Sequence, residues 1–186
     1  MISIAGDLGS GKSTIAKRLA ETLSYEYFST GILFRTLAAE RGMDALQLNY
    51  HSETDLSIDK YIDDNLRAIN DGNDSRYILD SRMAWFFVPK SFKIYATVKP
   101  EIAAQRVSSD KDRFGEPDAT DLQERVKTLL ERQNVENRRY KSIYDVDCGD
   151  LSNYDFVIDT SNDSVETLVE QILTMYGRFD SAQRPS

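Results

Sequence analysis

The sequence predicts an α/β fold in which helices cover both faces of a parallel sheet. Short, nearly continuous apolar segments, typical of strands buried on both faces, alternate along the 186 residues with longer segments whose apolar residues recur at helical spacing. A glycine-rich turn joins the first apolar segment to the first amphipathic one. In such folds ligands bind beyond the carboxyl ends of the strands, so we look for functional residues there.

The first 75 residues contain two expected strands and mostly helical segments. The expected elements are, in order, a strand over Met1–Ala5, a helix over 12–23, a strand over Tyr25–Phe28, a helix that Ser29 or Thr30 caps and that runs to about Arg41, where Gly42 stops it, short helices over 44–52 and 55–69, and a turn at Asp71–Asp74.

The second half repeats the alternation. The expected elements are strands over Arg76–Asp80 and Phe92–Val98, a helix from Pro100 to about Ser108, a loop over Ser109–Ala119, a long helix opened by a capping box of Thr120 and Gln123, a strand over Phe156–Ile158, and a last helix started by Asp163 with Glu166. We expect one domain over 1–177 and a disordered tail over 178–186.

Composition narrows the range of partners. The net charge of −8 disfavours nucleic acid and anionic membranes, which basic proteins usually bind. The chain shows neither a signal peptide nor an apolar run long enough to cross a bilayer, and its one cysteine, Cys148, permits no internal disulfide. We therefore expect a cytoplasmic protein with small-molecule substrates, in which Cys148 is a structural side chain. The sequence leaves the oligomeric state open.

The glycine-rich turn matches the phosphate-binding P-loop pattern G-x-x-x-x-G-K-[ST]. Glycines let successive backbone N–H groups turn inward around phosphates, and the following helix adds its positive end. Lys12 can reach the β- and γ-phosphates, and the Ser13 hydroxyl can bind Mg²⁺. We expect the nucleotide to contact the pattern and the residue after it, namely Gly6, Asp7, Leu8, Gly9, Ser10, Gly11, Lys12, Ser13 and Thr14.

Further charged residues are candidates for the chemistry. Asp80 ends an apolar strand, so it lies near the same sheet edge and can hold Mg²⁺ through water or polarise an acceptor; the alternative is an acidic residue in a turn. Arg132, Glu136 and Arg139 share one helical face, which fits either a phosphate clamp or a solvent-exposed set of ion pairs. The same two interpretations apply to Arg106, Lys111 and Arg113.

Several segments closely resemble the cytidylate kinases, and the later ones resemble the archaeal-type branch of that family. The matching segments are Gly9–Lys17, Tyr25–Gly31, Phe34–Arg35, Leu79–Trp85, Glu131–Tyr140, Tyr144–Asp147 and Asp155–Ser161. The resemblance extends from residue 1 to about residue 176. It implies a nucleoside monophosphate kinase fold with a helical substrate-binding insertion at about 42–75 and a lid at about 106–119. It also implies ATP, Mg²⁺ and CMP or dCMP as reactants.

The resemblance also implies roles for individual residues. Thr30, Gly31 and Arg35 would face the acceptor nucleotide, and Arg82 would hold its phosphate. Thr160 would lead into a loop near the adenine. Arg132, Glu136 and Arg139 would come from the helix after the lid. Arginines from that helix and from the lid, Arg106, Arg113 and Arg132, would act with Lys12 and Asp80 in phosphoryl transfer.

Two positions depart from the family pattern beside the acceptor site. Ser81 replaces the glycine before the arginine that matches Arg82, and Met83 replaces an aspartate of the bacterial branch that helps read the nucleotide. The archaeal branch usually has glutamate at the position of Asp80. These differences leave two alternatives to a cytidylate kinase open. One is a small-metabolite kinase on the same scaffold, and the other is a catalytically degenerate nucleotide-binding protein.

Overall fold

A five-stranded parallel sheet organises the molecule. The computed structural model describes residues 1–72, 74, 76–109 and 121–183. The strands lie in the order β2-β3-β1-β4-β5, and every pair is parallel. Their bounds are Ile2–Gly6 for β1, Glu26–Ser29 for β2, Tyr77–Asp80 for β3, Phe92–Thr97 for β4 and Phe156–Asp159 for β5. The predicted parallel sheet is therefore confirmed.

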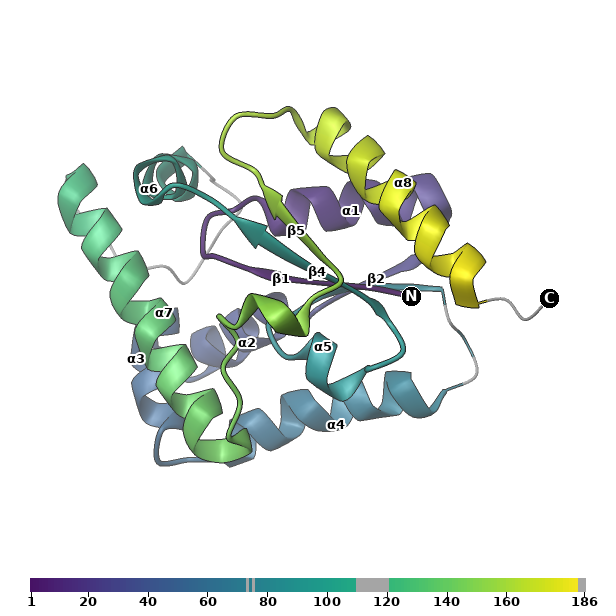
Figure 1. The fold of residues 1–186 in the computed structure, drawn as a ribbon. Coiled ribbons are helices and arrows are strands. Elements are labelled where there is room, and N and C mark those ends of the chain that lie inside the picture. The colour runs from purple at the N-terminus through teal and green to yellow at the C-terminus, as the bar shows by residue number, and fades with distance from the viewer. Residues whose placement is uncertain (73, 75, 110–120, 184–186) are drawn as a thin grey trace.

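Helices cover both faces of this sheet, as the sequence predicts (Figure 1). Helices α1 (Lys12–Leu23) and α8 (Val165–Gln183) pack on one face, and α4 (Ser57–Asp71) and α5 (Ala84–Phe87) pack on the other. Neighbouring residues of β3 contribute to different layers of the core, because side chains alternate along a strand: Ile78 packs on the first face and Leu79 on the second.

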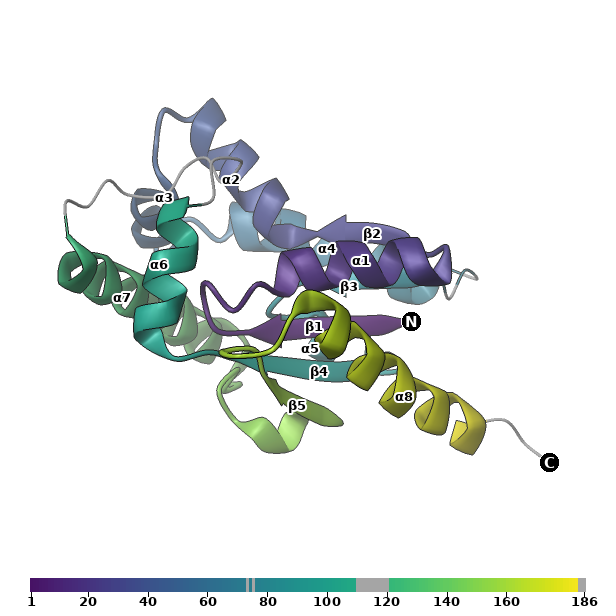
Figure 2. The same ribbon diagram turned by 90° about the horizontal axis from the view of Figure 1, so that it is seen from above.

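The remaining helices gather beyond the carboxyl ends of the strands. They are α2 (Thr30–Glu40), α3 (Ala45–Ser52), α6 (Pro100–Ser109) and α7 (Leu122–Tyr144). Figures 1 and 2 both show α3, α6 and α7 at this end of the sheet. A 3-10 turn, η1 (Leu151–Asn153), leads into β5. The sequence did not predict α5 or η1, which are too short to show a periodic pattern.

Local sequence explains where α2 begins and ends and where α3 begins. Ser29 caps α2, because its Oγ accepts from the backbone N–H of Ile32. Gly42, with a φ of +66°, follows that helix, as expected. Helix α3 begins with a complete capping box made by Asp44 and Gln47.

Two predicted helix starts are wrong by one residue. Asp121 caps α7 and accepts from the backbone of Glu124, whereas Thr120 lies outside the described residues. Ser164, rather than Asp163, accepts from the N–H of Thr167 at the start of α8. Each segment contains two adjacent residues able to cap, and spacing alone does not choose between them.

The predicted disordered tail is wrong over residues 178–183. Helix α8 continues to Gln183. Phe179 packs against the core, with its ring centroid 5.1 Å from that of Phe92. This aromatic contact gives the last turns of the helix an apolar anchor. Residues 184–186 lie outside the described part of the chain.

The predicted lid at about 106–119 begins inside α6, and its residues 110–119, including Lys111 and Arg113, lie outside the described residues.

No helix in the described part of the chain is both long and apolar enough to span a membrane.

Candidate active site

The P-loop joins β1 to α1 and takes a backbone path that requires glycine. Gly6 has a φ of +144°, and a Cβ there would lie 2.2 Å from the carbonyl oxygen of Ala96. Gly11 has a φ of +76° and directly precedes α1. The first turn of α1 has no acidic side chain and no side-chain cap, and the start of a helix carries positive charge, so it suits an anion.

The carboxylate of Asp7 anchors this loop. Its Oδ1 accepts from the Tyr95 hydroxyl at 3.0 Å and from Gln133 Nε2 at 3.1 Å. Its Oδ2 accepts from the backbone N–H of Val98 at 3.2 Å. These bonds tie the loop to the end of β4 and to α7. The carboxylate of Asp7 therefore holds the loop in position through these bonds. If Asp7 contacts a phosphate, it does so with its backbone N–H.

Asp80 and Ser13 meet at the end of β3. The Ser13 hydroxyl donates to Asp80 Oδ2 at 2.6 Å, and the Tyr27 hydroxyl donates to the same oxygen at 2.8 Å. Burial and the charge of Asp80 raise the pKa of Tyr27, which therefore remains a donor at neutral pH. Mg²⁺ prefers oxygen ligands and usually takes only one or two from protein carboxylates, so the hydroxyl of Ser13 and the carboxylate of Asp80 fit it.

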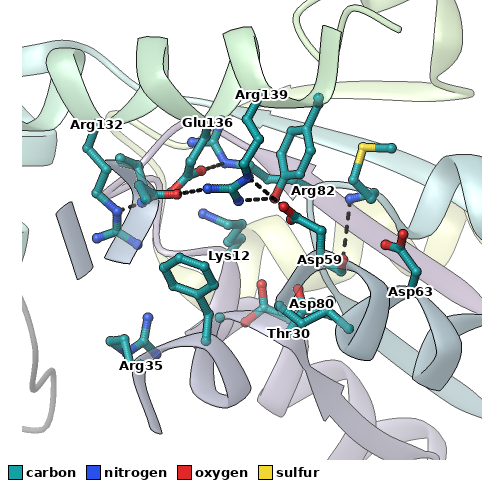
Figure 3. A pocket seen from close by; sticks show the side chains of 18 of the residues that line it. Lys12, Thr30, Arg35, Asp59, Asp63, Asp80, Arg82, Arg132, Glu136 and Arg139 are labelled. Atoms are coloured by element: carbon teal, nitrogen blue, oxygen red, sulfur yellow. Dashed lines mark hydrogen bonds and ion pairs between the residues drawn. The ribbon is translucent and has the colours of Figure 1, made fainter. Parts of the chain in front are cut away.

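One pocket gathers most of the predicted catalytic and acceptor residues. It is lined by Lys12, Ser13, Thr30, Gly31, Arg35, Asp80, Arg82, Arg132, Glu136 and Arg139, which come from the P-loop, from β3 and the residues after it, and from α2 and α7. Figure 3 shows Arg132, Glu136 and Arg139 descending from α7 toward Lys12. Residues more than 100 positions apart in the chain therefore meet in this pocket.

Glu136 is the centre of a buried charge cluster in this pocket. Its carboxylate lies 2.8 Å from Arg82 Nε and 3.1 Å from Arg132 Nε. The four charged residues Arg82, Arg132, Glu136 and Arg139 are each at most 9% exposed. Burial alone would raise the pKa of Glu136, but the charges of Arg82, Arg132 and Arg139 outweigh it and lower this pKa to about 2. The alternative of a solvent-exposed face on α7 is therefore wrong.

A second pocket adjoins the other side of the same loop. It is lined by the loop residues Gly9, Ser10 and Gly11 and by Thr14, Arg106 and Thr160. Arg106 donates to the carbonyl oxygen of Thr160 at 2.7 Å and to its hydroxyl at 3.3 Å. Arg106 and Thr160 therefore belong to one site, apart from the cluster around Glu136.

Comparison with known proteins agrees with this geometry. A family model described as an AAA domain matches residues 2–141. The chain is 37% identical over 163 residues to the cytidylate kinase of Haloarcula marismortui, covering 87% of this chain and 81% of that protein. It is 34% identical over 184 residues to the cytidylate kinase of Pyrobaculum islandicum, covering 95% of each. The chain belongs to the cytidylate kinase family. It is thus a nucleoside monophosphate kinase.

Solved structures support the fold. A shikimate kinase from Bacteroides thetaiotaomicron superposes with a TM-score of 0.65 at 12% identity, covering 95% of this chain and 97% of that one. A shikimate kinase from Acinetobacter baumannii gives a TM-score of 0.59 at 15% identity, over 98% and 94% of the two chains. At such identities the likeness concerns the fold alone.

Not every predicted site residue of the kinase lines the two pockets. Gly6 and Asp7 line neither of them, because both lie at the base of the loop. Arg113 lies outside the described residues. Leu8 lines the first pocket beside Lys12.

The sequence did not point to several acidic and polar residues that line the first pocket. Asn49 from α3 and Asp59 and Asp63 from α4 line the first pocket, as does Tyr140 from α7. The two aspartates were detectable, because they lie on the same face of the helix as the apolar residues Ile62 and Leu66. A charged residue on the inward face of an amphipathic helix indicates a buried partner or a ligand.

Proposed function

We propose that this kinase transfers the γ-phosphoryl group of ATP to CMP or dCMP, with Mg²⁺. The observation that carries the proposal is the buried arginine set of Arg82, Arg132 and Arg139 in the same pocket as Lys12. Three buried guanidinium groups facing the phosphate loop suit an acceptor that brings its own phosphate. The family relatives, which are named as cytidylate kinases, support cytidylate as that acceptor.

ATP fits across the P-loop. In this proposal its triphosphate lies on the backbone N–H groups before α1, and its adenosine lies in the second pocket beside Arg106 and Thr160. Ser13 and Asp80 would hold Mg²⁺, which would supply positive charge to the phosphate oxygens. Lys12, which lines the first pocket, adds a further cation.

The reaction needs positioning and charge stabilisation rather than a protein nucleophile. A phosphate oxygen of the acceptor attacks the γ-phosphorus in line, and the bond from that phosphorus to the β–γ bridging oxygen breaks, so the products are ADP and a nucleoside diphosphate. Lys12 and Arg132 stabilise the charge on the transferred group. The one cysteine plays no part, because Cys148 is buried and burial raises its pKa to about 11.

The deciding experiment measures ADP release by the purified kinase with ATP and Mg²⁺. The acceptors are CMP, dCMP, UMP, AMP, GMP and shikimate, with a reaction lacking acceptor. We expect turnover with the cytidylates well above that with the others, and formation of CDP or dCDP. The Lys12→Ala variant, purified in parallel, reveals any contaminating kinase. Turnover with shikimate alone, or with no acceptor, would overturn the proposal. We expect the reaction to take place in the cytoplasm.

A further inference from the structure

The first pocket, which in our proposal holds the acceptor and is called the acceptor pocket below, has two chemically different ends. Arg35, Arg132 and Lys12 make one end basic, whereas Asp59 and Asp63 from α4 make the opposite end acidic. Figure 3 shows Asp63 on the side of the pocket away from Arg132. A ligand that fills the pocket therefore needs an anionic group at one end and hydrogen-bond donors at the other.

Asp59 already has a cation as its partner. Its Oδ2 lies 3.1 Å from Arg139 Nε, and both side chains are buried. Arg139 also donates to the side chain of Asn49. Asp59 therefore fixes Arg139 beside it, and its charge is compensated within the protein.

The negative charge of Asp63 has no ion-pair partner of this kind among the described residues. Asp63 is 8% exposed and lines the pocket. Among the described residues, it has one hydrogen-bond partner, the neutral hydroxyl of Tyr144 on Oδ2, and no ion pair. Burial raises the pKa of Asp63 to about 6, against a smaller lowering by the Tyr144 hydrogen bond and by Arg67, while the nearby charges of Asp59 and Asp64 raise it further. At neutral pH a buried carboxylate thus has an oxygen open to a donor.

An ionised carboxylate only accepts hydrogen bonds. The proposed nucleotide acceptor places its phosphate at the basic end, so its base extends toward α4. Cytosine carries an exocyclic amino donor at C4, whereas uracil carries a carbonyl oxygen there. We propose that Asp63 binds the exocyclic amino group of the acceptor base and thereby selects CMP over UMP. This assignment rests on the proposed function.

A purely structural role for Asp63 makes a different prediction. In that case the side chain serves only to tie α4 to α7 through Tyr144. Tyr144→Phe removes this tie and keeps the carboxylate, whereas Asp63→Asn keeps an acceptor for Tyr144 and removes the charge. Asp64→Asn removes the same charge from the exposed face of the same helix. These three variants separate base selection from helix packing.

The test compares kcat/KM for CMP and UMP in the wild type and in the three variants. In Asp63→Asn the preference for CMP should fall by about tenfold or more, because the amide can donate to the uracil carbonyl. In Asp64→Asn and Tyr144→Phe the preference should stay within about threefold of wild type, since both variants keep the carboxylate of Asp63. An unchanged preference in Asp63→Asn, or an equal loss in Tyr144→Phe, would overturn the assignment.

A second measurement needs no variant. The 5′-monophosphate of pyrimidin-2-one ribonucleoside lacks the C4 amino group and otherwise resembles CMP. The wild type should use it with kcat/KM about tenfold or more below that of CMP. Equal use of the two compounds would overturn this inference and leave the proposed function standing. Equal use of CMP and UMP would overturn this inference together with the expected preference for cytidylates. An absence of turnover with every pyrimidine monophosphate would overturn both.

Discussion

The charge cluster in the acceptor pocket makes a quantitative prediction for Glu136→Gln. This change removes one negative charge and keeps the size of the side chain. Glu136 is 6% exposed and contacts Arg82 and Arg132 directly. The arginines lower the pKa of its carboxyl from 4.5 to about 2. At 1.36 kcal/mol for each pKa unit, this difference corresponds to about 3 kcal/mol. Removing one member of a buried ion pair costs a similar amount.

The pH dependence of this loss follows from the direction of the shift. A carboxyl whose pKa is lower in the folded state stabilises the fold fully above its unfolded pKa of 4.5, and the stabilisation is lost as pH falls toward about 2. The difference in unfolding free energy between wild type and Glu136→Gln should therefore be about 3 kcal/mol at pH 7 and should shrink below pH 4.5. Urea denaturation followed by circular dichroism at several pH values measures it.

A matched control and an anion titration sharpen this experiment. Glu131 lies on the exposed side of the same helix, so Glu131→Gln should change the unfolding free energy by about 0.5 kcal/mol or less. Inorganic phosphate should stabilise Glu136→Gln more than wild type, because the freed arginines bind it. A loss in Glu136→Gln below about 1 kcal/mol, or one that does not depend on pH, would refute our account of a cluster balanced by Glu136.

Four further predictions test other parts of the molecule. Lys12→Ala should lower kcat by about a thousandfold or more and leave the unfolding temperature unchanged, which steady-state kinetics and thermal denaturation measure. Asp80→Asn should raise the Mg²⁺ concentration for half-maximal activity by about tenfold or more; an unchanged value would remove Asp80 from the metal site. Phe179→Ala should lower the unfolding free energy by about 1–3 kcal/mol because α8 loses its contact with Phe92, with Ser181→Ala as the exposed control. The buried thiol of Cys148, whose pKa is raised to about 11, should resist iodoacetamide at pH 8 in the native protein and react in urea; rapid native reaction would contradict its burial.

Local spacing was enough to predict the phosphate loop and the face of α7. The residues from Gly6 to Ser13 are contiguous, and Arg132, Glu136 and Arg139 are one or two turns apart on one helix, so their neighbourhood does not depend on tertiary structure. Spacing did not reveal that this face is buried. The burial of this face depends on α3 and α4, which cover it. These helices contribute Asn49 and Asp59, which are far from α7 in the sequence.

The acidic residues of α4 were missed for a related reason. A helical pattern is found from its apolar positions, and Asp59 and Asp63 interrupt that pattern on its inward face. Their role becomes visible only when Arg139 and Tyr144 of α7 lie opposite them. The end of α8 was mispredicted because Phe179 looks like a lone aromatic in a polar tail, and its contact with Phe92 joins residues 87 positions apart.

The links from α7 to α3 and α4 bear on how acceptor choice varies on this scaffold. Arg139 connects α7 to α3 through Asn49 and to α4 through Asp59, and Tyr144 connects α7 to α4 through Asp63. Apart from Tyr144, the side chains that make these contacts also line the first pocket. The P-loop is anchored by other side chains, since Asp7 bonds to Tyr95 of β4 and to Gln133 of α7. A substitution on α3 or α4 can thus change the acceptor end of the pocket without displacing the phosphate loop, whereas one at Asp7 disturbs the loop directly.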